Sequence, residues 1–243
     1  MFNSISTRSI ACAASALLAI VTCAACGGSE PPPKAAEAAP EAEHESAGPV
    51  GVSAEIGGLN EDKVDKVFQR TLPDFQTCLD DGAKRVEFLG GGVSFFLKIN
   101  EHGKIDHAHL EKSTLGDRDT EKCMLDTLRK KRWPKPVGGV HGLARKSFDF
   151  DPPNDVRAPT SWDSDKVSDA IGKLSKKVSA CKEGTNGAFE ATVYVSTDGS
   201  VLAAGVTPPD EAGESNVDCL VGVLKGATLP SPGSWPAKVT FTL

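Results

Sequence analysis

The sequence predicts an α+β fold made of two tandem modules, each with the order helix, strand, strand, helix, strand. Two observations predict it: apolar residues repeat first at helical and then at strand spacing, and the whole series occurs twice. Gly103 in the stretch NEHGKI and Gly199 in STDGSV align at an offset of 96 residues. The same offset superposes Cys123 on Cys219 and places a Pro-x-Pro motif after each of them. The sequence therefore contains one architectural unit twice.

The first helix of each module begins after a short polar residue that can cap it. Asn60 and Asp163 are the expected N-cap residues. The apolar residues that recur at helical spacing are Val64, Val67, Phe68, Phe75 and Cys78 in one copy and Val167, Ala170, Ile171, Leu174, Val178 and Cys181 in the other. In this region the offset between the copies is 103 residues, which a longer loop after the first helix of the first copy explains.

Two strands joined by a glycine turn follow the first helix. Alternate residues are apolar, as in strands with one buried face: Val93, Phe95, Leu97 and Ile99, and Phe189, Ala191, Val193 and Val195. The turns are short polar loops of the kind that join hairpins. The second helices are expected to start near Asp119 and Ser215 and to end at the prolines, which cannot continue a helix. The last strands are KSFDFD and KVTFTL.

The N-terminus carries an expected export signal. Residues 10–21 form a short apolar run, whereas a membrane-spanning helix needs about 20 apolar residues. Residues 1–25 are therefore expected to be a signal peptide. Cys26 follows two alanines and resembles the lipidated first residue of a bacterial lipoprotein, and Gly27 after it favours the outer membrane, facing the periplasm or the cell surface. Secretion of a soluble, unlipidated product is the alternative.

Residues 26–58 are expected to be the lipidated cysteine followed by a disordered tether. Pro, Ala and Glu dominate it, and residues 27–49 contain no aromatic or long aliphatic side chain that could build a core. The net charge of −6 lies mostly in this tether, so the rest is nearly balanced and nucleic-acid binding is not expected. The modules then occupy residues 59–153 and 162–243, and the proline-containing linker at 154–161 is expected to be stiff.

Four cysteines lie beyond the signal region, one late in the first helix and one early in the second helix of each module. If both helices cover the same face of a small sheet, the two thiols of a module can meet. In an oxidising compartment we therefore expect the disulfides Cys78–Cys123 and Cys181–Cys219. A metal site is the alternative, although no C-x-x-C motif occurs.

A resemblance to a known family rests on Cys78, the stretches VSFFLKINEHGKI and STLGD, Cys123 with LRKKRWPKP, and the closing KSFDFDPP. The first module resembles the C-terminal domain of TonB proteins, and more closely the AgmX/PglI C-terminal domain of myxobacterial envelope proteins. The resemblance implies a three-stranded antiparallel sheet with two helices on one side, acting as an envelope interaction module. The second module is a diverged copy that lacks STLGD and the final DPP.

Two groups of polar residues are candidate sites. His107 and His109 share one face of a strand and could bind a transition metal or another ligand, with Glu111 following them. The second copy has Ala203 and Gly205 at these positions, so a solvated outer sheet face is expected here and a metal site is the alternative.

The second group is basic and consists of Arg129, Lys130, Lys131 and Arg132. It could contact an anionic lipid or an acidic partner, although cations are also favoured at a helix C-terminus by the helix dipole.

No Ser/His/Asp, Cys/His or paired-carboxylate arrangement and no phosphate-binding loop can be identified, so neither an enzyme nor a cofactor is expected. The leading hypothesis is a lipid-anchored envelope protein that presents its modules to a protein partner, through the final strands or the helix faces. A ligand or metal carrier that uses the His107 and His109 face is the second hypothesis. The sequence does not indicate the oligomeric state.

Overall fold

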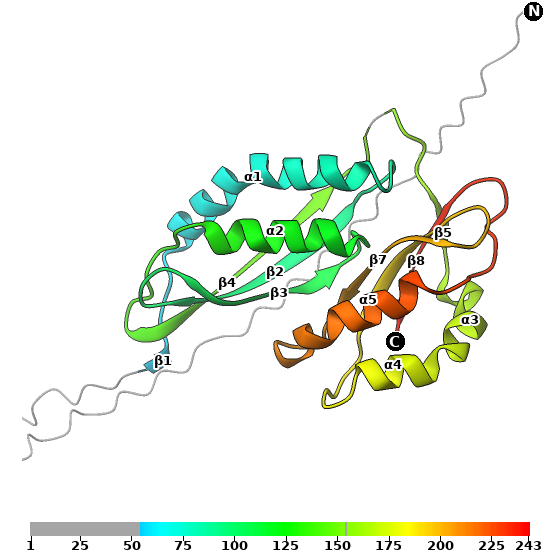
Figure 1. Cartoon of the computed structure of the whole chain (residues 1–243). Coiled ribbons are helices and arrows are strands. Elements are labelled where there is room, and N and C mark those ends of the chain that lie inside the picture. The colour runs from blue at the N-terminus through cyan, green and yellow to red at the C-terminus, as the bar shows by residue number, and fades with distance from the viewer. Residues whose placement is uncertain (1–53, 154) are drawn as a thin grey trace, which may run out of the picture. The chain divides into compact units, whose positions relative to one another are not determined.

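Two largely antiparallel sheets, each with helices packed on it, make up the computed structural model of the chain (Figure 1). The structure describes residues 54–153 (the first half) and 155–243 (the second half). The expected signal peptide, Cys26 and most of the expected tether lie outside the described residues. No helix in the described ranges is long and apolar enough to cross a membrane.

The first half contains a sheet with the strand order β1-β4-β2-β3. Its strands are β1 (Ala54–Ile56), β2 (Gly91–Asn100), β3 (Ile105–Ser113) and β4 (Gly139–Phe150), and its helices are α1 (Glu61–Ala83) and α2 (Arg118–Lys130). Strand β2 is central, and its alternate residues are buried as its sequence predicts. The buried residues pack against both helices in a core that includes Phe68, Phe75 and Phe95.

The second half repeats this order with the sheet β5-β8-β6-β7. Its strands are β5 (Thr160–Trp162), β6 (Glu190–Val195), β7 (Val201–Thr207) and β8 (Ala237–Thr242). Its helices are the 3₁₀ helix η1 (Ser164–Lys166), α3 (Ser168–Lys173), α4 (Ser175–Cys181), the 3₁₀ helix η2 (Ala212–Asn216) and α5 (Val217–Lys225). A second core lies between this sheet and its helices, with Phe189, Val193 and Leu220 among its buried residues.

The glycine turns have the same environment in both halves. Gly103 and Gly199 have positive φ angles of 70° and 86°, a backbone conformation that glycine adopts without strain. The carbonyl of Gly103 accepts a hydrogen bond from the N–H of Trp133 at 3.0 Å, and that of Gly199 accepts one from Leu229 at 2.9 Å. A side chain at either glycine would collide with the carbonyl oxygen of that same Trp or Leu. The turn and the start of the Pro-x-Pro motif are therefore in contact in both halves.

Each sheet has one strand more than the three expected. Strand β1 pairs in parallel with the start of β4, at Gly139 and His141, and β5 pairs in parallel with β8 from Ala237 to Val239. The expected tether (26–58) and linker (154–161) therefore each include residues that belong to a sheet. Three-residue strands are too short to show an alternating apolar pattern, and that is why the sequence does not reveal them.

The first helices of the two halves differ more than expected. Asn60 caps α1 by accepting a hydrogen bond from the N–H of Lys63 at 2.9 Å, as predicted. Asp163 makes no such bond, and the corresponding segment consists of η1 followed by α3 and α4, which meet at Leu174. The expected start near Ser215 falls in η2, one turn before α5.

Both expected disulfides are present. Cys78 in α1 is bonded to Cys123 in α2, and Cys181 at the end of α4 is bonded to Cys219 in α5. Each bond ties together the two helices that cover one sheet, and neither bond joins the two halves. Such bonds are typical of an oxidising, exported environment.

Candidate interaction surfaces

The two halves pack directly on each other within one compact unit. The edge strands β3 and β7 lie side by side, and Tyr194 of β6 belongs to the hydrophobic core of the first half. Its hydroxyl donates a hydrogen bond to the carbonyl of Gly90 at 3.0 Å and accepts one from the N–H of Gly90 at 3.3 Å. The side-chain amine of Lys238 donates to the same carbonyl at 2.6 Å, and its burial lowers its pKa to about 8. The expected stiff linker therefore does not hold the modules apart.

A buried carboxylate lies in this contact. Glu121 of α2 is fully buried and accepts a hydrogen bond from the Ser113 hydroxyl at 2.6 Å. Its carboxylate lies against Gly205 of β7, where an added Cβ would come within 2.6 Å of Oε1. The second oxygen, Oε2, has no hydrogen-bond partner among the described residues. Burial raises the pKa of Glu121 to about 7 because it disfavours the charged form.

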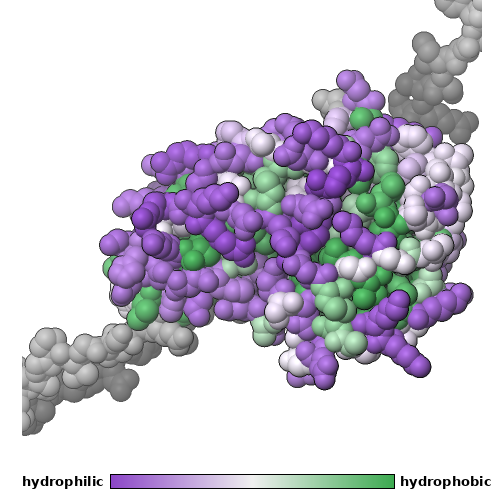
Figure 2. Space-filling model, in the orientation of Figure 1, coloured by the Kyte–Doolittle hydropathy of each residue, from purple (hydrophilic) through white to green (hydrophobic). Residues whose placement is uncertain are grey.

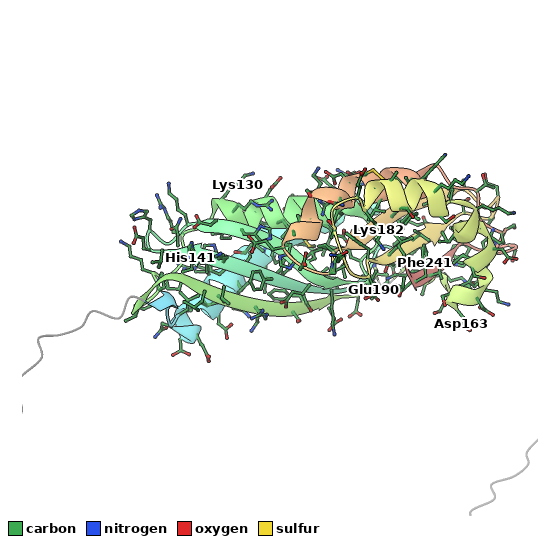
Figure 3. The ribbon with its side chains drawn as sticks, turned by 90° about the horizontal axis from the view of Figure 1, so that it is seen from below. Lys130, His141, Asp163, Lys182, Glu190 and Phe241 are labelled. Atoms are coloured by element: carbon green, nitrogen blue, oxygen red, sulfur yellow. A yellow bond between two sulfur atoms is a disulfide. The ribbon has the colours of Figure 1, made fainter. Side chains whose placement is uncertain are left out.

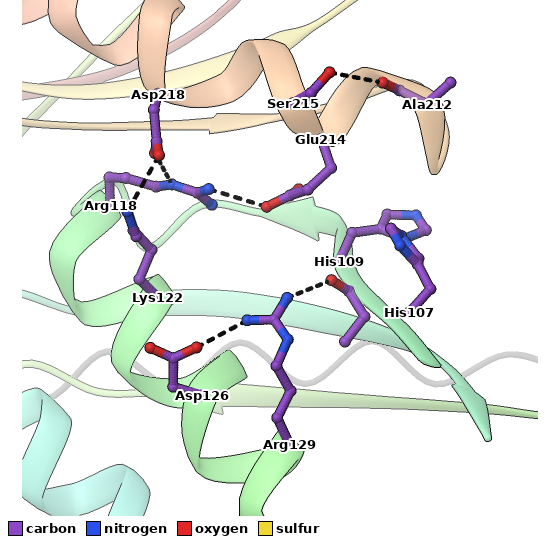
Figure 4. A network of polar contacts seen from close by, with 11 residues as sticks. His107, His109, Arg118, Lys122, Asp126, Arg129, Ala212, Glu214, Ser215 and Asp218 are labelled. Atoms are coloured by element: carbon purple, nitrogen blue, oxygen red, sulfur yellow. Dashed lines mark hydrogen bonds and ion pairs between the residues drawn. The ribbon is translucent and has the colours of Figure 1, made fainter. Parts of the chain in front are cut away.

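An ion-pair network closes the contact on the helix side (Figure 4). The guanidinium of Arg118 in α2 donates to Asp218 at 2.8 Å and to Glu214 at 2.9 Å. Lys122 also contacts Asp218 at 3.1 Å, and the hydrogen bond from Arg118 is the main cause of the lowered pKa of Asp218. Arg118 is itself buried, so removing both carboxylates would leave a buried charge uncompensated.

His107 and His109 do lie together, but not on a solvated face. The Nε2 atom of His107 is 3.0 Å from the Nδ1 atom of His109, and His109 is only 5% exposed (Figure 4). Glu211 of the second half lies 3.5 Å from His107 Nδ1. Burial, and then the neighbouring His107, lower the pKa of His109. The expectation of a solvated outer face is therefore wrong at His109, because the second half covers this part of the sheet.

His109 borders a cavity of about 390 Å³. Its walls include Phe96 and Arg145, whose guanidinium lies 4.7 Å from the centre of the Phe96 ring. Glu111, which the sequence groups with the histidines, forms an ion pair with Arg145 at 2.8 Å instead. Within residues 54–153 and 155–243, no group of three or more His, Cys, Asp or Glu side chains is arranged to hold a metal ion.

The basic run divides into two kinds of residue. Arg129 forms an ion pair with Asp126 and donates to the carbonyl of Ala108, and Lys131 forms an ion pair with Asp74 at 2.6 Å. Lys130 and Arg132 are exposed and have no ion-pair partner in the described part of the chain. Only these two are available to an anionic partner without breaking an internal contact.

The final strands are open edges over only part of their length. β1 pairs only with the start of β4. From Leu143 to Phe150, the edge of β4 that faces away from β2 has no described strand beside it. β5 covers β8 as far as Val239 and leaves Thr240 to Thr242 open. Lys238, at the covered end of β8, is enclosed between the halves rather than exposed for pairing. The longer open edge is therefore that of β4.

Sequence analysis missed Glu121, Tyr194 and Gly205 as interface residues. Each occupies an ordinary position in the amphipathic pattern of a helix or strand, so pattern reasoning treats it as surface or core of its own module. The one available signal is Gly205, a glycine inside a strand, which commonly marks the close approach of another group.

No protein-family model, curated protein or solved structure matches this chain. The functional argument therefore depends on the residues and contacts of the chain itself.

Proposed function

We propose that this chain is a non-enzymatic, lipid-anchored protein of the bacterial cell envelope that serves as a protein-interaction or scaffold module. Cys26 behind two alanines supplies the lipidation site, and the acidic segment after it supplies the tether. The two disulfides support an exported location. Gly27 after Cys26 favours the outer membrane.

The two halves are proposed to be diverged copies of one module of the TonB C-terminal and AgmX/PglI C-terminal kind. The matching strand orders, the matching positions of the disulfides and the matching contacts of Gly103 and Gly199 support a duplication. The parallel strands β1 and β5 are additions to the three strands that the resemblance implies.

The open edge of β4 is the observation that carries the proposed interaction role. From Leu143 to Phe150 the strand pairs with β2 on one side only, so alternate backbone N–H and C=O groups point away from the sheet. Such an edge accepts an extended segment of another protein by backbone hydrogen bonding. Arg145, Ser147 and Asp149 along it are exposed, and they suit a polar or charged partner segment better than an apolar one.

Site-specific photocrosslinking in cells tests this role. A photoreactive amino acid at Ser147 or Asp149 should capture a discrete envelope protein, whereas the same group at Lys173, exposed on α3, should not. Equal capture at all three positions, or none at any, would contradict docking on the β4 edge. Radiolabelled palmitate incorporation that is lost in Cys26→Ser tests the anchor separately.

A small-ligand carrier is a second candidate, and the cavity beside His109 favours it. The two imidazoles face each other at 3.0 Å, a separation that two ligands of one metal ion also adopt, but a third protein ligand is not found in the described ranges. Calorimetric titration of Zn²⁺ and Ni²⁺ into the wild type and into a His107→Ala, His109→Ala double variant decides this. Identical heats in the two proteins would exclude the carrier hypothesis for these metals.

A further inference from the structure

Exposed hydrophobic side chains gather at one end of the first half. Within the described residues, the large hydrophobic side chains that are exposed are Val137 at 78%, Ile56 at 48%, Val140 at 42% and Leu202 at 37%. Three of these four belong to β1, to the start of β4 or to the segment that leads into β4. Figure 2 shows hydrophobic colour reaching the surface at this end of the molecule, near β1.

Backbone hydrogen bonds hold the segments of this end together. The N–H of Gly58 donates to the carbonyl of Val137 at 3.0 Å, and the N–H of Val137 donates back to Gly58 at 2.9 Å. Gly57 donates to His141 at 2.6 Å, so the loop from Val137 into β4 is fixed against the end of β1. The exposed valines are therefore carried on a defined tip and are not side chains of a free loop.

Three exposed cations come from segments next to this tip. Lys104 lies in the turn between β2 and β3, which contacts Trp133 through Gly103, and Arg132 and Lys135 flank Trp133 in sequence. All three are exposed, and none forms an ion pair with a carboxylate in the described part of the chain. Glu101, the acidic residue of the same turn, lies 3.4 Å from His102. Lys130 and His141 lie toward this end in Figure 3.

We propose that this tip docks onto the surface of an anionic lipid bilayer, with Val137 and Val140 entering the headgroup region and Lys104, Arg132 and Lys135 contacting lipid phosphates. Exposed apolar side chains with cations on neighbouring segments suit such a surface. The apolar groups can enter the boundary between headgroups and acyl chains, and the cations can pair with the phosphates. The tip also carries β1, which lies near the end of the expected tether (26–58), so this inference rests on the proposed lipid anchor. Docking would fix the orientation in which the β4 edge is presented.

Tryptophan quenching by brominated lipid tests the contact on the full chain. Val137→Trp and Leu202→Trp each add one indole to an exposed position, the first at the tip and the second on β7 of the second half. Each protein is bound to vesicles of brominated phosphatidylglycerol and phosphatidylethanolamine, and its emission is compared with that in unbrominated vesicles. The added fluorescence should be quenched at least twofold at position 137 and unchanged at 202. Equal quenching at both positions, or none at 137, would overturn the proposal.

Charge reversal tests the part played by the cations. Arg132→Glu with Lys135→Glu in the Val137→Trp protein should restore most of the quenched emission, as should vesicles of phosphatidylcholine alone. Near an anionic surface each lost cation weakens binding by about fivefold. Lys173→Glu with Lys176→Glu is the matched control, since both lysines are exposed on helices of the second half. Loss of quenching in the control pair as well would show a non-specific charge effect and overturn the proposal.

Vesicle flotation separates this proposal from the anchor. If the wild-type protein floats but the indole at position 137 is not quenched, the proposed lipid anchor stands and the proposed docking of the tip is excluded. At roughly 0.5 M salt, electrostatic attraction to the vesicle surface is largely screened. Loss of flotation of the Cys26→Ser protein under this condition would show that the lipid on Cys26 is the anchor. Flotation of wild type that does not depend on Cys26, with position 137 quenched, would remove the proposed anchor and retain the tip. A protein partner that protects position 137 from brominated lipid would overturn the proposal.

Discussion

Glu121 shows how a single residue depends on a neighbour far away in sequence. Its carboxylate fits between the halves only because residue 205 has no side chain, and Ser113 satisfies one of its two oxygens. The other oxygen has no partner among the described residues, so the charged form of Glu121 is poorly compensated. The protonated form suits the site better, and for that reason its pKa is raised.

We expect Glu121 to make stability depend on pH. The pKa of Glu121 rises from 4.5 to about 7 on folding, so the folded chain retains a proton that the unfolded chain releases in this interval. The free energy of unfolding should therefore fall as pH rises from about 4.5 to 7, by roughly 3 kcal/mol on this account. Glu121→Gln should remove that fall and be more stable than the wild type at pH 8. Urea unfolding at several pH values measures both.

Glu87→Gln is the control for this prediction. Glu87 is exposed, so its replacement should leave the dependence on pH as it is in the wild type. A Glu121→Gln protein whose stability follows the wild-type pH profile would contradict the assignment.

At the scale of elements, the two halves pack equivalent helices differently. Val178 of α4 occupies the position that corresponds to Phe75 of α1. Leu243 is paired with Phe189 in the second sheet, as Phe148 is paired with Val93 in the first. The rings of Phe75 and Phe148 are 5.8 Å apart and fill the first half. In the second half a groove of about 400 Å³ remains, lined by Ile171, Val178 and Leu243 among others. Smaller side chains therefore fill the core of the second half less completely.

The two disulfides should differ in how readily they are reduced. Each closes a loop of similar length, 45 and 38 residues apart in sequence, so each is expected to contribute roughly 4 kcal/mol by the chain-entropy model. Cys78 is buried, whereas Cys219 is exposed on α5. Because exchange requires access to a sulfur atom, limited dithiothreitol should reduce Cys181–Cys219 first. Timed alkylation followed by peptide mass spectrometry gives the order.

The opposite order of reduction would mean that the first pair opens more often than its burial indicates. Cys78→Ser with Cys123→Ser and Cys181→Ser with Cys219→Ser are matched double variants. Under oxidising conditions each double variant should have a lower midpoint of urea unfolding than the wild type. Neither variant should have a lower midpoint than wild type whose disulfides have been fully reduced.

At the scale of the whole molecule, the contact between the halves should make the described residues unfold together. Tyr194 of one half lies in the core of the other, and two hydrogen bonds join its hydroxyl to Gly90. We expect one unfolding transition, with the same midpoint for circular dichroism and for tryptophan fluorescence. Trp133 is in the first half, and Trp162 and Trp235 are in the second, so fluorescence samples both.

Tyr194→Phe should lower the free energy of unfolding by about 1–3 kcal/mol, because it leaves the buried N–H of Gly90 without a partner. Leu202→Ala on the neighbouring strand is the control and should change it little, since Leu202 is partly exposed. Two separate transitions in the wild type would contradict the packing of the halves.

Local patterns in the sequence are enough to determine the α+β class, the repeated element order, the cap at Asn60 and both disulfides. Each depends on residues close in sequence, or on a spacing that recurs later in the chain. The tertiary structure alone decides the short parallel strands, the burial of His109 and the placing of Glu121 against Gly205. These depend on contacts between segments on the order of 80 residues apart or more, and no helical or strand period encodes which surface another module will cover.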